Sequence, residues 1–366
     1  MLQRKLRILH APANVAGIAG LLARAQRDLG HDATSVEYFK RPFQFGVDLT
    51  LGLQAGDGRL KKAARMGLFA LGALRRYDVF HLYFGNTLLP SPYPDLPLLR
   101  SLGKRIVFHF CGCDLRRRRP TLNRHSLSAC TDCVSQMCLH LKHPALSSAD
   151  VLIVSTPDLL EFAPGAHLLP GPVDLARWMP KVSRGIPVSA SEPIRIVHAP
   201  TDREIKGTRY LLAAVERLKS AGHAVELDLL EGLPHEQVQA LSERADIAVD
   251  QLMLGSYGTF SIEMMAKGLP VVCRIREDLR QFYPPDLPVI TAEPGSIYEV
   301  LESLITRPDD WAEFGRRGIQ YVQREHEMHR VAARALALYN VGLSKATGIA
   351  PGDPNYIPEA SDIRAV

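Results

Sequence analysis

The sequence predicts an α/β protein made of two doubly wound parallel sheets, and a repeat inside the chain supports this prediction. The segment LRILHAP at residues 6–12 returns as IRIVHAP at residues 194–200. In both copies a glycine-containing loop and an amphipathic segment follow, and then Gly-His and a second apolar run. A buried strand, a loop and a helix in this order begin a doubly wound sheet. The two copies therefore predict two Rossmann-like domains.

The same repeat predicts where a ligand binds. Ligands of open α/β sheets bind outside the carboxyl ends of the strands. His10 and His198 each stand at the end of the first strand of a copy. We therefore expect both rings to face a central cleft between the domains, with His198 in the ligand site.

Length and composition agree with a globular two-domain protein. The 366 residues correspond to about two domains, and 46% hydrophobic and 23% charged residues are ordinary for globular chains. We predict a first domain over residues 1–178 and a linker rich in Pro, Ser and Gly over 179–193. A second domain with closing helices is predicted over 194–343, and an extended tail over 344–366.

The charge pattern bears on partners and location. A net charge of +5 is too mild to indicate nucleic-acid binding, and anionic small ligands or a lipid surface suit it better. No apolar stretch is long enough for a signal sequence or a membrane span, which indicates a cytoplasmic protein. Residues 59–77 place an apolar helix between basic ends, a pattern of helices that lie on anionic lipid at the inner membrane face. A helix packed on the sheet is the commoner origin of this pattern.

Two segments of the second half carry a resemblance to a known family. ADIAVDQLMLGSYGTFSIEMMAKGLPVVC at residues 245–273 resembles the donor-binding segment of family 4 glycosyltransferases. HAPTDREIKGTRYLLAAVERL at residues 198–218 is similar to the phosphate-binding segment of the same enzymes. The resemblance covers roughly residues 5–340 and implies the GT-B fold, in which two facing Rossmann-like domains hold a nucleotide sugar and an acceptor. It implies transfer of the sugar to an acceptor hydroxyl with retention, in polysaccharide or cell-envelope glycan synthesis on a saccharide or lipid-linked acceptor.

Two cations after the second copy of the repeat are candidates for the diphosphate. The departing nucleotide diphosphate gains negative charge, which cations and helix N-termini stabilise. Lys206 and Arg203 lie in the segment with the phosphate-binding resemblance, although the arginine of the family falls at Thr201 here. A solvated pair in a loop is the alternative reading of these two side chains.

The donor motif supplies further candidates. Glu263 matches the second glutamate of the motif, and its carboxylate can accept both ribose hydroxyls; a glutamate near a helix N-terminus is the alternative. The first glutamate of the motif, eight residues earlier, is Gly255 here. The backbone amides of Gly258, Thr259 and Phe260 can approach a phosphate or sugar.

In the first domain, candidates follow two strand ends. Gly17 lies at a helix start, where glycine lets a ligand approach the backbone. His109 and Asp114 are the catalytic candidates, and Asp114 and Arg116 can bind acceptor or phosphate or pair with each other. The histidine that faces the sugar in many relatives falls at Cys111. Since no Asp-x-Asp stands in a suitable loop, we expect no catalytic divalent metal.

Five cysteines form a separate cluster in an insertion over residues 111–138. Cys111 and Cys113 form a C-x-C pair, Cys130 and Cys133 form a C-x2-C pair, and Cys138 follows as a single cysteine. Such pairs can chelate zinc or an iron-sulfur cluster, and we favour a structural zinc that holds the insertion beside the cleft. Free thiols and a disulfide are the alternatives.

Two other functions remain open for this sequence. A GT-B nucleotide-sugar epimerase would release free sugar without an acceptor. A non-catalytic nucleotide-sugar-binding protein would fit Gly255 and the cysteine cluster.

Overall fold

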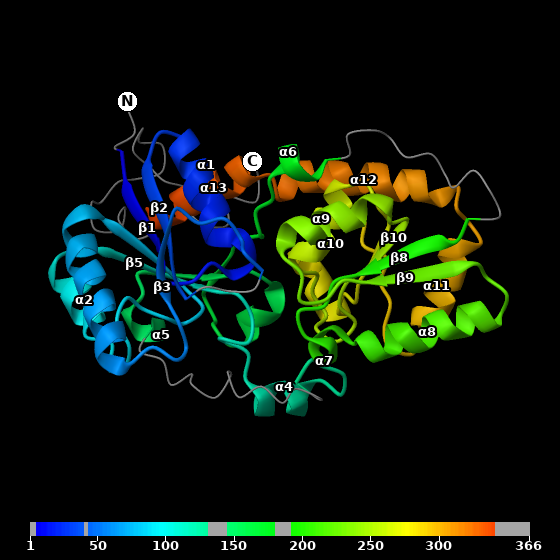
Figure 1. Ribbon diagram of the computed structural model, residues 1–366, viewed down its shortest axis with the longest axis horizontal. Coiled ribbons are helices and arrows are strands. Elements are labelled where there is room, and N and C mark those ends of the chain that lie inside the picture. Colours follow the sequence, from blue (N-terminus) through cyan, green and yellow to red (C-terminus); the bar gives the residue numbers. More distant parts are fainter. Residues whose placement is uncertain (1–4, 40–42, 131–144, 180–191, 341–366) are drawn as a thin grey trace.

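The computed structural model describes residues 5–39, 43–130, 145–179 and 192–340, and Figure 1 shows two lobes side by side. Each lobe contains a parallel β-sheet with helices on both faces, and the two sheets have seven and four strands. The predicted fold of two facing doubly wound domains is therefore confirmed. The linker positions 180–191 and the tail 344–366 lie outside the described residues.

The first sheet has the strand order β3-β2-β1-β4-β5-β6-β7, and every neighbouring pair in it is parallel. Its inner strands are apolar runs buried on both faces, as parallel sheets require. Its strands are β1 (Arg7–Ala11), β2 (Asp32–Phe39), β3 (Leu49–Leu53), β4 (Val79–Tyr83), β5 (Arg105–Phe110), β6 (Val151–Val154) and β7 (His167–Leu168).

Helices cover this sheet on both faces. One face packs against α2 through Met66, Ala70 and Leu74, which recur at helical spacing; the other packs against α1 through Leu22 and Ala23. The helical segments of this lobe are η1 (Val15–Gly17), α1 (Ile18–Asp28), α2 (Arg59–Arg76), α3 (Asp95–Ser101), α4 (Arg118–Arg124), α5 (Ala145–Ser148) and η3 (Pro157–Glu161). The next helix, α6 (Leu175–Trp178), already packs against α10 in the core of the second lobe.

The second sheet has the parallel order β11-β10-β8-β9. Its strands are β8 (Ile194–His198), β9 (Val225–Leu229), β10 (Ile247–Val249) and β11 (Val271–Val272). The surrounding helical segments are α7 (Arg203–Lys206), α8 (Thr208–Ser220), α9 (His235–Leu241), η4 (Ser242–Arg244), α10 (Thr259–Ala266), η5 (Glu277–Phe282), α11 (Ile297–Ile305) and α12 (Asp310–Glu325). The two copies of the repeat thus form β1 and β8, the first strand of each sheet.

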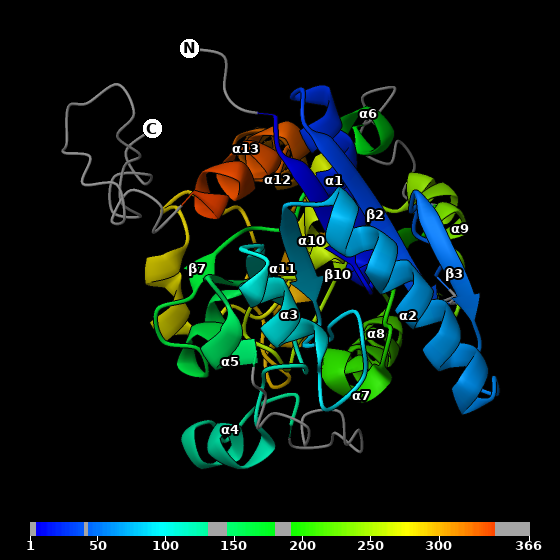
Figure 2. The same cartoon turned by 90° about the vertical axis from the view of Figure 1, so that its left-hand side faces the viewer.

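The last helix, α13 (Met328–Tyr339), returns to the first lobe. It lies beside α1 in Figures 1 and 2, and its Val331, Ala335 and Tyr339 share a buried core with Ile8 of β1 and Leu22 of α1. The second domain was predicted to span residues 194–343, but the chain crosses between the lobes twice, before α6 and after α12. No helix among the described residues is long and apolar enough to cross a membrane.

Candidate active site

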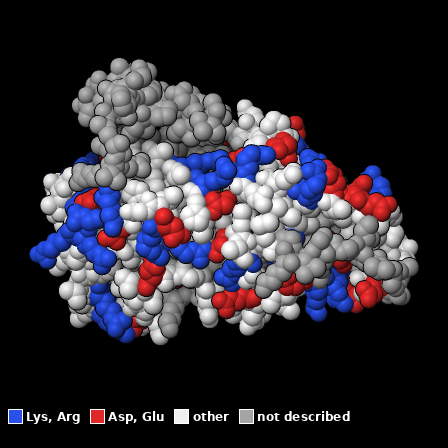
Figure 3. All heavy atoms as spheres, turned by 90° about the horizontal axis from the view of Figure 1, so that it is seen from above, with Lys and Arg blue, Asp and Glu red and all other residues white. Residues whose placement is uncertain are grey.

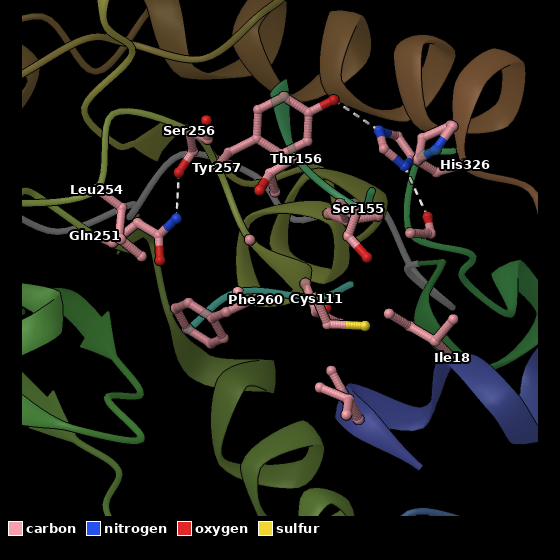
Figure 4. Close-up of a pocket in the computed structure, with 18 of the residues that line it drawn as sticks. Ile18, Cys111, Ser155, Thr156, Gln251, Leu254, Ser256, Tyr257, Phe260 and His326 are labelled. Carbon is pink, nitrogen blue, oxygen red and sulfur yellow. Dashed lines mark hydrogen bonds between the residues drawn. The ribbon is translucent and has the colours of Figure 1, made fainter. Parts of the chain in front are cut away.

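A cavity of about 1070 Å³ lies between the carboxyl ends of the two sheets and is lined by both lobes. The first lobe contributes the loops after β1, β5 and β6, and the second contributes the loops after β8 and β9 and the start of α10. Figure 4 shows side chains of both lobes around this space. This is the position that strand polarity predicts for the ligand site.

Lys206 lines the cavity, and its Nζ lies close to Gly258, the N-cap of α10. Its Nζ donates to Asp250 Oδ1 at 2.5 Å and to Gln251 Oε1 at 2.9 Å. Asp250 is buried, and its other oxygen accepts from the Gly258 amide and the Ser261 hydroxyl. Although burial by itself raises the pKa of Asp250, the Lys206 ammonium and these donors bring the net shift below the ordinary value. The site therefore holds a buried ion pair beside the amides at the start of α10, of which that of Gly258 donates to Asp250.

Gly258, Thr259, Phe260 and Glu263 also line the cavity. Glu263 is buried, and His235 Nε2 donates to its Oε1 at 2.6 Å. Burial raises the pKa of Glu263, and the His235 bond opposes this shift.

The His235 ring is itself held in place by aromatic contacts from outside the second sheet. Its centroid lies 4.5 Å from that of Phe45, which comes from the first lobe, and 5.3 Å from that of Trp178. The carboxylate of Glu263 is thus positioned by a side chain that both lobes support.

Gly255 has a structural reason for lacking a side chain. Its φ is +81°, and a Cβ there would lie 2.5 Å from Cγ and 2.7 Å from Cδ of Arg276. Arg276 donates its Nε to Asp278 and its Nη2 to Glu161, which belongs to the first lobe. Arg276 therefore fills the space that a side chain at Gly255 would need.

Arg203 lies apart from the cavity. It forms a bidentate pair with Glu231 at 2.7 and 2.5 Å and is not among the lining residues. The burial of Arg203 is low, with 54% of its side chain exposed, so in this conformation it contacts Glu231 instead of the space where a diphosphate would lie.

The two repeat histidines are buried away from the cleft, which differs from our expectation. His198 bonds to the Val249 carbonyl at 2.8 Å and the Thr208 hydroxyl at 2.9 Å, and His10 bonds to Tyr83 and Gln26. Side chains alternate between the faces of a strand, so both rings point into helix-covered faces and neither lines the cavity. Burial lowers the pKa of each ring to about 4.

The first-lobe candidates support the loop after β5. Asp114 accepts from the amides of Cys111 and Gly112, and burial raises its pKa to about 6. Arg116 lines the cavity and pairs with Asp158 at 2.7 Å, not with Asp114. Asp158 also accepts from the Ser256 hydroxyl at 3.1 Å, which joins the lobes.

Gly17 and His109 lie just behind the cavity wall. Gly17 has a φ of +78°, and Phe45 packs so closely that a Cβ would lie 3.1 Å from its ring. His109 is buried, with its ring nitrogens bonded to His81 and Ser155. Neither residue lines the cavity, while their neighbours Ala16, Ile18 and Cys111 do.

The structure describes three of the five clustered cysteines. Cys111 and Cys113 line the cavity and Cys130 is buried, whereas Cys133 and Cys138 lie outside the described residues. Within the described ranges, no group of three or more His, Cys, Asp or Glu side chains is arranged to hold a metal ion. Zinc bound by the complete set stays a prediction.

Sequence reasoning missed several residues that line the cavity. They are Ser155, Thr156, Ser256, Tyr257 and His326, and Figure 4 shows them around the central space. Ser155 follows β6 directly, so its position at a strand end was the available signal. His326 bonds to Tyr257 and to the Gly171 carbonyl, contacts between distant segments that no local pattern reveals.

Comparison with known proteins agrees with this architecture. A family model described as glycosyl transferase-like matches residues 203–337. The chain therefore has the GT-B fold, and its second lobe is similar to glycosyltransferases. No curated protein matches the sequence significantly.

Solved structures share the fold of this chain over nearly its whole length. Sucrose-phosphate synthase from Thermosynechococcus elongatus is 16% identical, with a TM-score of 0.64 over 94% of this chain and 100% of that chain. A glycosyltransferase from Rickettsia africae is 12% identical, with a TM-score of 0.61 over 92% and 98% of the two chains. HepE from Anabaena, solved with UDP and glucose, is 12% identical, with a TM-score of 0.61 over 94% and 100%.

Proposed function

We propose that this protein is a glycosyltransferase that moves a sugar from a nucleotide diphosphate sugar to an acceptor hydroxyl with retention. The observation that carries the proposal is the Lys206 ammonium at the N-terminus of α10, inside a cavity lined by both lobes. A cation and the amides of a helix N-terminus together stabilise the growing charge of a departing diphosphate. Retention and a role in polysaccharide or cell-envelope glycan synthesis rest on the family 4 resemblance.

In this proposal each lobe has its own substrate. The start of α10 and Lys206 hold the diphosphate and Glu263 accepts from the ribose hydroxyls, as its buried position beside the cavity allows. The acceptor enters on the side of the β1 and β5 loops. Since HepE was solved with UDP and glucose, UDP sugars are the first donors to test.

Thermal stabilisation by UDP, GDP, ADP and their sugars tests the donor site. A ligand present at one hundred times its Kd stabilises the native state by about 2.7 kcal/mol. We expect a selective rise in Tm that disappears in Glu263→Ala and persists in Glu277→Ala, a control with a 90% exposed side chain. The absence of a shift with every nucleotide would refute the donor site and support the non-catalytic reading.

Turnover separates transfer from the epimerase alternative. Consumption of the donor that depends on an added saccharide supports transfer, whereas free sugar released without any acceptor supports epimerisation. The metal content of the purified protein tests the structural zinc, and less than about a tenth of an equivalent would refute a tight tetrahedral site.

We further propose that α2 binds an anionic membrane surface, which would bring the enzyme to a lipid-linked acceptor. Leu60, Leu68 and Leu71 are 88%, 76% and 57% exposed on its outer face. The helix carries six Lys and Arg and no acidic residue, although Lys61 and Arg76 have acidic partners on neighbouring segments. Figure 3 shows Lys and Arg gathered at the first-lobe end of the molecule. Apolar side chains among cations match an interfacial helix.

Sedimentation with vesicles tests this surface. We expect binding to vesicles of equal phosphatidylglycerol and phosphatidylcholine, weaker binding in high salt, and none to pure phosphatidylcholine. The triple variant Leu60→Ser, Leu68→Ser, Leu71→Ser should lose binding. The pair Leu98→Ser, Leu102→Ser changes exposed leucines at α3 and should not. Equal binding by the triple variant and the wild type would exclude α2 as the contact.

A further inference from the structure

Seven polar side chains form a continuous hydrogen-bonded chain through the core of the first lobe to the cavity wall. We call it the relay, and in order it consists of Tyr83, His10, Gln26, Tyr339, His81, His109 and Ser155. The successive contacts measure 2.7, 2.8, 3.1, 2.6, 3.1 and 2.9 Å. The first six members are almost fully buried, and Ser155 lines the cavity.

The Gln26 amide sets the direction of the hydrogen bonds. Its oxygen accepts from His10, and its nitrogen donates to the Tyr339 hydroxyl. If Tyr339 also accepted from His81, its own proton would be buried without an acceptor, which costs about 1–3 kcal/mol. Tyr339 therefore donates to His81 Nδ1.

From His81 onward, tautomer chemistry fixes the remaining steps. A neutral imidazole has one donor and one acceptor nitrogen. Since His81 Nδ1 accepts, its Nε2 donates to Nδ1 of His109, and His109 Nε2 in turn donates to Ser155 Oγ. With its oxygen occupied in this way, the Ser155 hydroxyl directs its proton away from His109.

The geometry points to Ser155 as a hydrogen-bond donor to a sugar oxygen in the cavity, with His109 as its positioning residue. This inference rests on the proposed function. The neighbouring Thr156 also lines the cavity, and its buried Oγ1 has no hydrogen-bond partner within the described structure. Two adjacent hydroxyls with unused hydrogen-bonding capacity match a saccharide, whose hydroxyls both donate and accept; phosphate oxygens only accept.

The relay orients Ser155 without carrying charge. Burial lowers the pKa of His109 to about 3 and that of His81 well below its ordinary value. It also raises the pKa of the Tyr339 hydroxyl above its ordinary value. No charged group is among its members, so protonation of an imidazole between pH 6 and 8 is unfavourable. His109 therefore acts through Ser155 and does not exchange a proton with the substrate at these pH values.

Binding of UDP and of UDP sugars to the wild type and to Ser155→Ala tests the inference. Using UDP, UDP-glucose, UDP-galactose and UDP-N-acetylglucosamine in calorimetry, we expect Ser155→Ala to leave the Kd of UDP within about twofold. The Kd of the preferred UDP sugar, or of free glucose added to the UDP complex, should rise about tenfold, as expected for one hydrogen bond of roughly 1.4 kcal/mol. A weaker Kd for the UDP sugar assigns the Ser155 contact to the donor sugar. A weaker Kd for free glucose in the UDP complex assigns it to the acceptor.

Two further variants separate positioning from folding. Ser155→Thr keeps the hydroxyl and should retain sugar affinity, while His109→Phe should lose it as Ser155→Ala does, with UDP binding intact. A folding defect would weaken UDP binding equally. Unchanged sugar affinity in Ser155→Ala would overturn the inference. So would a sugar affinity of the wild type that changes with pH near 6.5, if this pH dependence is absent in His109→Phe. If the wild type binds no nucleotide, the proposed function itself fails.

Discussion

Acidification should destabilise this protein steeply, because five histidines are buried without charge. Burial lowers the pKa of each ring. It falls to about 4 in His10, His198 and His326, to about 3 in His109, and well below the ordinary value in His81. In the unfolded chain a histidine titrates near 6.5. Below that pH the unfolded state binds protons that the folded state does not, so stability is greatest above pH 6.5 and falls as pH decreases toward the folded pKa values.

The size of the effect follows from the two pKa values. Between pH 7.5 and 5.5 each histidine contributes about 1.4 kcal/mol of destabilisation, and the five together about 7 kcal/mol. Asp114 opposes this, since its raised pKa of about 6 favours the folded state by roughly 0.8 kcal/mol over the same interval. A loss of about 6 kcal/mol is comparable with the whole stability of many proteins.

Urea unfolding followed by circular dichroism at several pH values measures this loss. His198→Gln keeps a donor and an acceptor and should remove about one fifth of the pH dependence. His329→Gln should change it slightly in the opposite sense, because Glu327 raises the pKa of that exposed ring. A loss below about 2 kcal/mol between pH 7.5 and 5.5 would refute the reasoning, since it would mean that the five rings accept protons in the folded protein.

Two substitutions test the second lobe. Lys206→Ala should weaken nucleotide diphosphate binding and also lower Tm, because it leaves the buried Asp250 unpaired at a cost of about 3–5 kcal/mol. Adding Asp250→Asn to this variant should restore Tm but not the affinity for the nucleotide diphosphate. If titration calorimetry showed that the affinity also recovers, Lys206 would not belong to the diphosphate site. Gly255→Ala should cost about 1–3 kcal/mol of stability for its φ of +81°, plus the crowding with Arg276. Gly103 has a φ of +62° and no atom within 4 Å of an added Cβ, so Gly103→Ala measures the backbone cost alone. If Gly103→Ala and Gly255→Ala lowered Tm equally, Arg276 would be free to move away from the new Cβ.

The fold could be predicted from the sequence because its evidence is local. The repeated strand ending in HAP, the loop glycines and the apolar helix faces all lie within short segments, and each turned out to begin a parallel sheet. The start of α10 was predictable for the same reason, since Gly258 to Glu263 is one continuous motif that lines the cavity.

The partners of the candidate side chains could not be predicted in this way. Lys206 pairs with Asp250, Glu263 with His235, and Gly255 lies under Arg276, and the members of each pair are more than twenty residues apart. Strand residues gave no sign of which face they would occupy, so the histidines at strand ends were expected at the cleft. Sequence patterns report the element that carries a side chain, and tertiary packing decides what it contacts.

The return of α13 to the first lobe also governs the order in which the protein can fold. The core over α1 contains Val331, Ala335 and Tyr339, which leave the ribosome only after the entire second lobe has been made. Domains usually fold in turn during synthesis, yet here the first must wait with an uncovered apolar face until α13 has been made. A fragment that ends before β8 would keep that face exposed, so the first lobe is a poor candidate for separate expression, and a chaperone has a defined surface to protect during translation.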